Sequence, residues 1–180
     1  MADVPVIDLR DHEAPARIDR ACREHGFFSV TGHGIDAGLL DDLLRTAAEF
    51  FARPETEKAE IAMARGGWAW RGWFPLAGEL TSGVPDRKEG IYFGAEDPAG
   101  DPRPLHGPNL FPRHPAELRP TVLAVLDAFT ALGHRLMGLL AVGLGLPEDT
   151  FARDLTADPT ILFRIFHYPP VAAGDGAGDW

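Results

Sequence analysis

Hydrophobic and polar positions follow two periods along this chain, one typical of strands and one typical of helices. Short β-branched runs predict strands, and apolar residues spaced three to four apart predict helices. In chain order these elements are a strand at 4–9, a helix at 14–25, a strand at 27–31, a helix at 36–51 and a short charged helix at 55–61. Asp36 is the expected N-cap of the second helix, and Pro54 interrupts it.

The second half of the chain carries the longest apolar helical face. A helix is predicted to begin at Pro115 or Glu117 and to run to about Leu146, where glycines and a proline follow. A last strand is predicted at 161–168, before a double proline and a Gly/Ala loop. An isolated sheet edge there would leave backbone groups unpaired, so on packing grounds the predicted sheet is incomplete.

Residues 65–115 lack a sustained period and are rich in glycine, proline and aromatic residues. Trp68, Trp70 and Trp73 lie within six residues. Tryptophan is costly to leave in water, so the segment is predicted to be an ordered loop that packs on something. A strand is predicted inside it at 88–93. Long ordered loops of compact domains are usually functional.

Composition narrows the class of protein. A chain of 180 residues is long enough for one domain with a core. Its 17 basic and 27 acidic residues give a net charge of −10, which argues against a nucleic-acid or anionic-membrane partner. Cys22 is the single cysteine, so no internal disulfide and no Cys-rich zinc site is expected. No signal peptide is recognised and the longest apolar run is short for a membrane span, so a cytoplasmic location is expected.

A search for catalytic motifs in the sequence finds no metal triad. A mononuclear non-haem iron site uses two histidines and a carboxylate, and part of that set is commonly His-x-Asp or His-x-Glu. Of the seven histidines, only His33 comes near, and its spacing to Asp36 is wrong by one residue. No His-Glu-x-x-His, nucleophile elbow or phosphate loop is present. No metal ligand and no catalytic residue are therefore predicted. His33 and Asn109 are predicted to stabilise turns.

Six blocks of sequence, taken in order, carry a resemblance to a known family. They are 4–9 (VPVIDL), 24–35 (EHGFFSVTGHGI), 50–58 (FFARPETEK), 71–73 (RGW) with 86–89 (DRKE), 107–112 (GPNLFP) and 164–170 (RIFHYPP). Together they resemble the N-terminal portion of the isopenicillin-N-synthase-like oxygenases, which are mostly Fe(II)- and 2-oxoglutarate-dependent enzymes. Two blocks depart from the usual pattern: Trp73 stands where tyrosine is common, and Leu110-Phe111 where Gln-Trp is common.

The resemblance implies an α+β chain built as the N-terminal helical and strand region of a double-stranded β-helix (jelly-roll) oxygenase, with a long helix packed on an incomplete sheet. Residues 1–115 would form the N-terminal dioxygenase-type region, and residues 116–180 the long helix and first strands of a truncated jelly-roll core. In the family a strand with His-x-Asp follows the Tyr-Pro strand, and a second histidine and Arg-x-Ser come later. This chain stops at Trp180, before any such motif.

The same resemblance nominates site residues. Tyr168 and Arg164 are predicted to bind the cosubstrate 2-oxoglutarate. Arg164 is separated from Tyr168 by four positions, so period-two alternation places both on one face with Phe166. If that face lines the cavity, as the resemblance favours, the partner of Arg164 would be a carboxylate of cosubstrate or substrate. If the opposite face lines it, the lining residues are Phe163, Ile165 and His167. Phe166 is predicted to line the substrate site, together with Arg71, Trp73 and Phe74. For each residue a packing role or a surface ion pair is the alternative.

Two functions stay open from the sequence. One is the N-terminal part of an oxygenase that oxidises a small molecule by hydroxylation, desaturation or ring closure, with Fe(II), 2-oxoglutarate and dioxygen. The other is an inactive remnant, or a binding subunit that self-associates or takes a second chain at its open sheet edge.

Overall fold

The computed structural model describes residues 3–81 and 84–170. Contacts within the chain define two compact units. One comprises Met1–Leu43 and Pro120–Pro159, and the other Leu44–Arg119 and Thr160–Trp180. The predicted boundary between regions 1–115 and 116–180 stays a prediction. The glycine-rich loop predicted after residue 170 lies outside the described residues.

The first unit contains a strand–helix–strand arrangement. Strand β1 (Val6–Asp8) pairs in parallel with β2 (Ser29–Thr31), and helix α1 (Ala14–Glu24) connects them. Parallel strands cannot be joined by a tight turn, so a crossover of this kind is required. The core of the unit is made by the apolar side chains of β1 and α1 and their flanks: Ile7, Leu9, Ala14, Ile18 and Ala21.

Helix α4 (Leu118–Gly143) supplies the rest of that core, and α5 (Thr150–Asp154) follows it. Four leucines of α4 pack against the core residues: Leu132, Leu136, Leu139 and Leu140. Arg135 fixes the helix further by donating to the backbone carbonyls of Leu9, at 2.7 Å, and Gly32, at 3.2 Å. By length and hydropathy α4 also qualifies as a candidate membrane span, a test that core helices of soluble proteins pass too.

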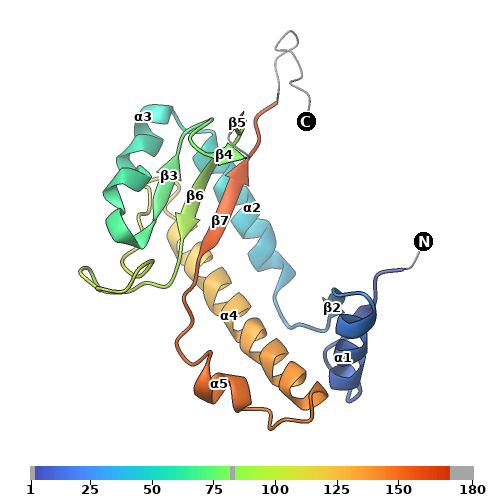
Figure 1. The fold of residues 1–180 in the computed structure, drawn as a ribbon. Coiled ribbons are helices and arrows are strands. Elements are labelled where there is room, and N and C mark those ends of the chain that lie inside the picture. The colour runs from blue at the N-terminus through green and yellow to red at the C-terminus, as the bar shows by residue number, and fades with distance from the viewer. Residues whose placement is uncertain (1–2, 82–83, 171–180) are drawn as a thin grey trace. The chain divides into compact units, whose positions relative to one another are not determined.

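The second unit contains a sheet whose strands are rich in aromatic residues. Strands β3 (Gly72–Phe74), β6 (Glu89–Phe93) and β7 (Phe163–His167) form an antiparallel sheet with β6 in the centre (Figure 1). Strands β4 (Leu80–Thr81) and β5 (Val84–Pro85) form a small hairpin between β3 and β6 in the chain. Among residues 3–81 and 84–170, no further strand pairs with the outer edge of β7.

Helical segments precede this sheet in the chain. They are α2 (Ala37–Phe51), which begins in the first unit, α3 (Glu55–Lys58), and the 3-10 turns η1 (Ala59–Ile61), η2 (Met63–Arg65) and η3 (Gly67–Ala69). Phe50 and Phe51 at the end of α2 and Ile61 of η1 are buried. The three short turns fold the region that lacks a sustained period, because its glycines and aromatics suit neither a long helix nor a long strand.

The predicted elements reappear with shorter bounds. The strand expected at 88–93 is β6, that expected at 161–168 is β7, and the long helix ends at Gly143. The mixed helix and sheet content agrees with the predicted α+β class. The strand β3 and the helix α5 were not predicted, because β3 (Gly-Trp-Phe) contains no β-branched residue and α5 is too short to show a repeated helical period. The packing of the long helix on the sheet that contains β7 stays a prediction.

Candidate functional site

The β3–β6–β7 sheet separates its side chains onto two faces. In the register, Tyr92 stands opposite Gly72 and Arg164, and Gly90 stands opposite Phe74 and Phe166. Paired residues of antiparallel strands point to the same side, and neighbours along a strand point to opposite sides. We call the side carrying Phe74, Tyr92, Arg164, Phe166 and Tyr168 the Tyr168 face, and the side carrying Trp73, Glu89, Ile91 and His167 the Glu89 face.

Aromatic rings pack together on the Tyr168 face. The ring of Phe166 lies 6.2 Å from Phe74, 6.4 Å from Tyr92 and 6.5 Å from Tyr168, each in an edge-on arrangement. Such tilted pairs are the favoured geometry between aromatic rings. Gly90 makes this packing possible, since a Cβ there would lie 2.6 Å from the Phe74 ring and 2.7 Å from the Phe166 ring. Phe74 and Tyr92 are buried, whereas Tyr168 is 59% exposed.

Two cations accompany these rings. Lys88 Nζ lies 4.6 Å from the Phe166 ring centre, and the Arg164 guanidinium carbon lies 5.3 Å from it. Lys88 also forms ion pairs with Asp86 at 2.9 Å and Glu79 at 3.6 Å. The hydrogen bond to Asp86 raises the pKa of Lys88. The Tyr168 face therefore combines an aromatic surface with two cations.

Tyr92 connects the aromatic rings to the acids nearby. Its hydroxyl forms a hydrogen bond with Glu79, which also pairs with Lys88. Burial, together with that bond to Glu79, raises the pKa of Tyr92. The phenol is therefore un-ionised at neutral pH and serves as a hydrogen-bond donor to the carboxylate.

The Glu89 face holds a buried polar network. Oε2 of Glu89 accepts hydrogen bonds from Lys58 Nζ at 2.7 Å and from Trp73 Nε1 at 2.8 Å. Oε1 of Glu89 lies 2.9 Å from His167 Nδ1. Lys58 donates additionally to the Phe51 carbonyl at 3.1 Å, and the His167 ring stacks on the Phe51 ring with centres 5.2 Å apart. Lys58 and Glu89 are both buried, so their charges compensate each other away from water.

The charge on Glu89 is held by its partners. Burial alone raises the pKa of Glu89, but the hydrogen bonds from Lys58, His167 and Trp73 outweigh it and leave the pKa below its ordinary value. An ionised Glu89 is needed to balance Lys58. The network therefore ties α3, β3, β6 and β7 together through one carboxylate.

Arg71 lies just before β3, and its side chain donates hydrogen bonds to backbone carbonyl groups of other segments. It is completely buried and donates to the carbonyls of Ala69 at 2.6 Å, Leu105 at 2.7 Å and Ile161 at 3.4 Å. Burial lowers the pKa of Arg71, while nearby acids oppose that change. A Cβ at Gly94 would overlap the guanidinium group, so the glycine leaves room for it. These contacts form a structural link between three segments, and the substrate-binding role of Arg71 stays a prediction.

The other predicted site residues are distributed unequally. Phe74, Arg164, Phe166 and Tyr168 meet on the Tyr168 face. Trp73 lies on the opposite face, buried, with its indole nitrogen bonded to Glu89. A substrate would have to reach it through the Glu89 face. Ligand binding by any of these residues stays a prediction.

His33 makes the kind of local contact that was predicted, whereas Asn109 does not. The backbone nitrogen of Ile35 donates to His33 Nδ1 at 3.1 Å, which is a contact within a turn. The Asn109 side chain instead accepts from Gly94 N at 2.8 Å and donates to Gly94 O at 2.8 Å, fifteen positions away. Asn109 therefore links its own segment to the end of β6.

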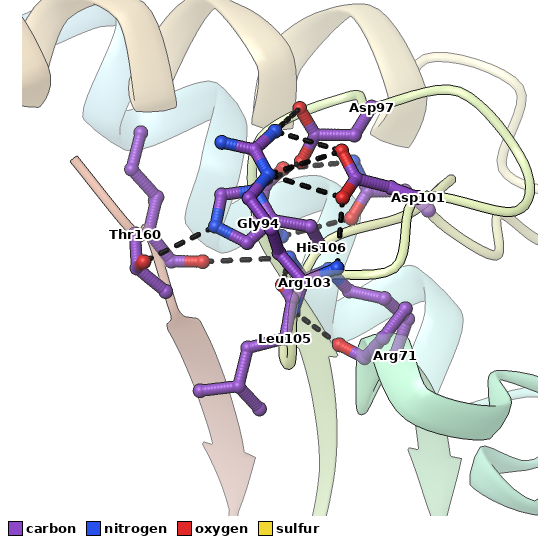
Figure 2. A network of polar contacts seen from close by, with 11 residues as sticks. Arg71, Gly94, Asp97, Asp101, Arg103, Leu105, His106 and Thr160 are labelled. Atoms are coloured by element: carbon purple, nitrogen blue, oxygen red, sulfur yellow. Dashed lines mark hydrogen bonds and ion pairs between the residues drawn. The ribbon is translucent and has the colours of Figure 1, made fainter. Parts of the chain in front are cut away.

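A second polar cluster joins the loop after β6 to the segment before β7. His106 Nδ1 lies 3.0 Å from Asp97 Oδ2, and its Nε2 lies 3.1 Å from the Thr160 hydroxyl (Figure 2). Arg103 contacts both acids, 2.7 Å from Asp101 Oδ2 and 3.9 Å from Asp97 Oδ1. The hydrogen bonds from Arg103 hold the pKa of Asp101 at about 2.

This cluster includes three potential metal ligands, Asp97, Asp101 and His106, whose donor atoms lie within 4.8 Å of one another. The expectation that the chain offers no metal ligands is therefore not confirmed. The donor set does not fit the expected iron site, because it has one histidine and two carboxylates where two histidines and one carboxylate are used. Arg103 neutralises Asp101, and both nitrogens of His106 already have partners.

Comparison with known proteins assigns the fold and the family. The structure superposes on a 2OG-Fe(II) oxygenase family protein from Caulobacter crescentus with a TM-score of 0.78 at 23% identity, over 97% of this chain and 59% of that one. It also superposes on a full-length Neurospora crassa protein in complex with alpha-KG, with a TM-score of 0.73 at 26% identity, over 92% and 54%. The chain thus has the fold of the part of these 2OG-Fe(II) oxygenases on which it superposes, which is somewhat more than half of each.

The family model described as "non-haem dioxygenase in morphine synthesis N-terminal" matches residues 4–114, so the chain belongs to this non-haem dioxygenase family. It is 43% identical to a "Probable iron/ascorbate oxidoreductase" of Dictyostelium discoideum, over 93% of this chain and 50% of that protein. It is 31% identical to a 2-oxoglutarate-dependent dioxygenase of Aspergillus niger, over 97% and 60%. The chain spans about half the length of the curated relatives it matches.

The residues that sequence reasoning missed are Lys58, Glu89 and His167. Each lies in a block that carried the resemblance, yet no role was assigned to Lys58 or Glu89, and His167 was named only as a lining residue if the opposite face of the last strand faces the cavity. The partners of Glu89 stand 31, 16 and 78 positions from it in the sequence. One signal in the sequence could have indicated this network. Lys58 and Glu89 are a basic and an acidic residue that lie in blocks with apolar residues, as expected for a buried ion pair.

Proposed function

We propose that this chain is the N-terminal part of a non-haem Fe(II)- and 2-oxoglutarate-dependent oxygenase that oxidises a small molecule. Membership of the dioxygenase family supports the reaction class. The single observation that carries the placement of the site is the Tyr168 face, where Arg164, Phe166 and Tyr168 follow one another along one side of β7 and just beyond its end. The jelly-roll core, of which β7 would be an early strand, is part of this proposal.

In such enzymes dioxygen is the oxidant, 2-oxoglutarate supplies two of the electrons that reduce it, and a bound iron would catalyse the reaction. The residues of this chain would bind and orient. Tyr168 is an exposed residue whose hydroxyl can donate to a carboxylate of 2-oxoglutarate, while its ring stays packed against Phe166. The rings of Phe74, Tyr92 and Phe166 would exclude water from one wall of the site. The iron ligands are proposed to come from the segment that follows the Tyr-Pro strand in the family.

The test starts from the reading frame beyond codon 180. We expect a His-x-Asp motif soon after it and a second histidine further on. The chain 1–180 with added Fe(II) should form no stoichiometric succinate from 2-oxoglutarate, whereas the chain extended through those motifs should form it. In the extended chain, Tyr168→Phe should raise the KM for 2-oxoglutarate about tenfold, since one hydrogen bond to a charged group is lost. Succinate formation by 1–180 alone, or no such motif in any frame, would overturn the proposal.

One observation favours the second candidate, a binding subunit without catalysis of its own. The outer edge of β7 carries backbone groups that no other strand pairs with in residues 3–81 and 84–170. Such an edge accepts a strand from a second chain. This candidate predicts a stable dimer or a co-purified partner in native mass spectrometry. A folded monomer of 1–180 would count against it.

A further inference from the structure

The two cations of the Tyr168 face differ in their charge balance. Lys88 is paired with Asp86 and Glu79, so its charge is compensated locally. The Arg164 guanidinium lies over aromatic rings, 5.3 Å from Phe166 and 5.9 Å from Tyr92. In the part of the chain that the structure describes, no carboxylate forms an ion pair with Arg164. Arg164 is also exposed, and therefore open to an anion from solution.

Position along β7 separates Arg164 from Tyr168. Four residues of an extended strand place their Cα atoms about 13 Å apart. The Phe166 ring lies between them, 5.3 Å from the Arg164 guanidinium and 6.5 Å from the Tyr168 ring. The hydroxyl and the guanidinium therefore approach a ligand from two ends of the same aromatic surface.

From this arrangement we infer that Tyr168 and Arg164 serve two different ligands, and that Arg164 selects a primary substrate that carries a carboxylate beside a ring. The carboxylate would pair with the guanidinium fork, and the ring would lie on Phe166. This inference rests on the proposed function, because it assumes that Tyr168 binds the cosubstrate. It assigns a substrate class, a ring-bearing carboxylic acid, to the same site.

Charge and shape both support this assignment. A planar guanidinium that lies over aromatic rings can still present N–H groups for bidentate hydrogen bonds to a carboxylate, although Arg164 also interacts with the Tyr92 hydroxyl. The rings also exclude part of its hydration, so that less water must be displaced when an anion binds. Lys88 lies over the same Phe166 ring, but its pairing with Asp86 leaves Arg164 as the cation that a substrate carboxylate would meet.

The test is an NMR titration of the isotope-labelled chain 1–180, read at the Arg164 Nε–H and at the ring signals of Phe166 and Tyr168. The probes are phenylacetate, the uncharged phenylacetamide and 2-oxoglutarate. We expect phenylacetate to shift the Arg164 and Phe166 signals and phenylacetamide to shift them far less. Arg164→Gln should weaken phenylacetate binding about tenfold. Arg164→Lys should retain part of it, and Arg153→Gln, which removes an exposed cation on α5, should change nothing.

The 2-oxoglutarate arm separates this inference from the proposed function. We expect 2-oxoglutarate to shift Tyr168 in the unmodified chain and in Arg164→Gln, but not the ring that replaces it in Tyr168→Phe. Loss of that response in Arg164→Gln would make Arg164 a cosubstrate residue and overturn the inference while the proposed function stands. No response at Tyr168 alongside intact phenylacetate binding would overturn the cosubstrate role of Tyr168 and with it the division between two ligands, while the carboxylate site at Arg164 would stand. Equal binding of acid and amide, or no phenylacetate binding, would overturn the inference.

Discussion

One sheet presents two faces that differ in how their polar groups are satisfied. On the Glu89 face, the carboxylate has Lys58, Trp73 and His167 as partners within 2.9 Å, and the charges are buried together. On the Tyr168 face, Arg164 and Tyr168 stay exposed and lack a carboxylate partner among the described residues. A polar group that the fold has already satisfied stabilises structure, whereas one left open is available to a ligand. The difference separates residues that stabilise the sheet from residues that would bind a ligand on it.

Removing the buried carboxylate of Glu89 should cause the largest loss in the free energy of unfolding. Glu89→Gln leaves the Lys58 charge buried without a counter-charge, and we expect the free energy of unfolding to fall by about 3 kcal/mol. Urea denaturation followed by circular dichroism measures it. The matched control is Glu57→Gln, which breaks a half-exposed pair with Arg53 and should cost less than about 1 kcal/mol. Equal losses in the two variants would mean that the network does not stabilise the sheet.

Filling the space above Gly90 should cause the second largest loss in the free energy of unfolding. Gly90→Ala places a methyl group against the rings of Phe74 and Phe166, and we expect a loss of about 1–3 kcal/mol from overpacking. Gly133→Ala is the control. Gly133 lies inside α4 with no atom near its Cβ position, so alanine there should stabilise the helix by about 0.5–1 kcal/mol. The sign difference between the two glycines, measured in the same urea experiment, tests the packing of the Tyr168 face.

The stability of the Glu89 face should depend on pH in one direction. The pKa of Glu89 is lower in the folded chain than its ordinary value of 4.5, so the ionised network contributes fully above that pH. Its contribution is lost as the pH falls through the folded-state pKa, where Glu89 takes up a proton and Lys58 loses its counter-charge. The stability gap between the unmodified chain and Glu89→Gln should therefore narrow below about pH 4.5. A gap that stays constant from neutral pH into the acid range below that pKa would contradict this.

The elements of this fold could be predicted from the sequence better than the contacts among them. Period and β-branching were enough to locate β6, β7 and α4, and alternation along 163–167 was enough to place Arg164 and Phe166 on one side. Periodicity carries no information about which buried charges meet. The pairing of Lys58 with Glu89 depends on how α3 reaches the sheet, and Glu89 meets His167 only through the register of β6 and β7.

Arg71 and Trp73 show the same limit at the level of the site. The resemblance predicts that Arg71 and Trp73 border a substrate, and that role stays a prediction. It did not predict that Arg71 donates to three backbone carbonyls or that Trp73 donates to Glu89. Their side chains are set by the close approach of distant segments, at Gly94 and at Leu105, which local sequence does not encode.

The division of the sheet into a structural face and a ligand face is tested most directly by comparing two variants in one urea denaturation experiment. The account predicts that Glu89→Gln loses about 3 kcal/mol and that the double variant Arg164→Gln with Tyr168→Phe loses less than about 0.5 kcal/mol, as expected for exposed groups outside a buried polar network. A double variant that loses as much as Glu89→Gln would show that Arg164 and Tyr168 hold the fold, and would contradict the account.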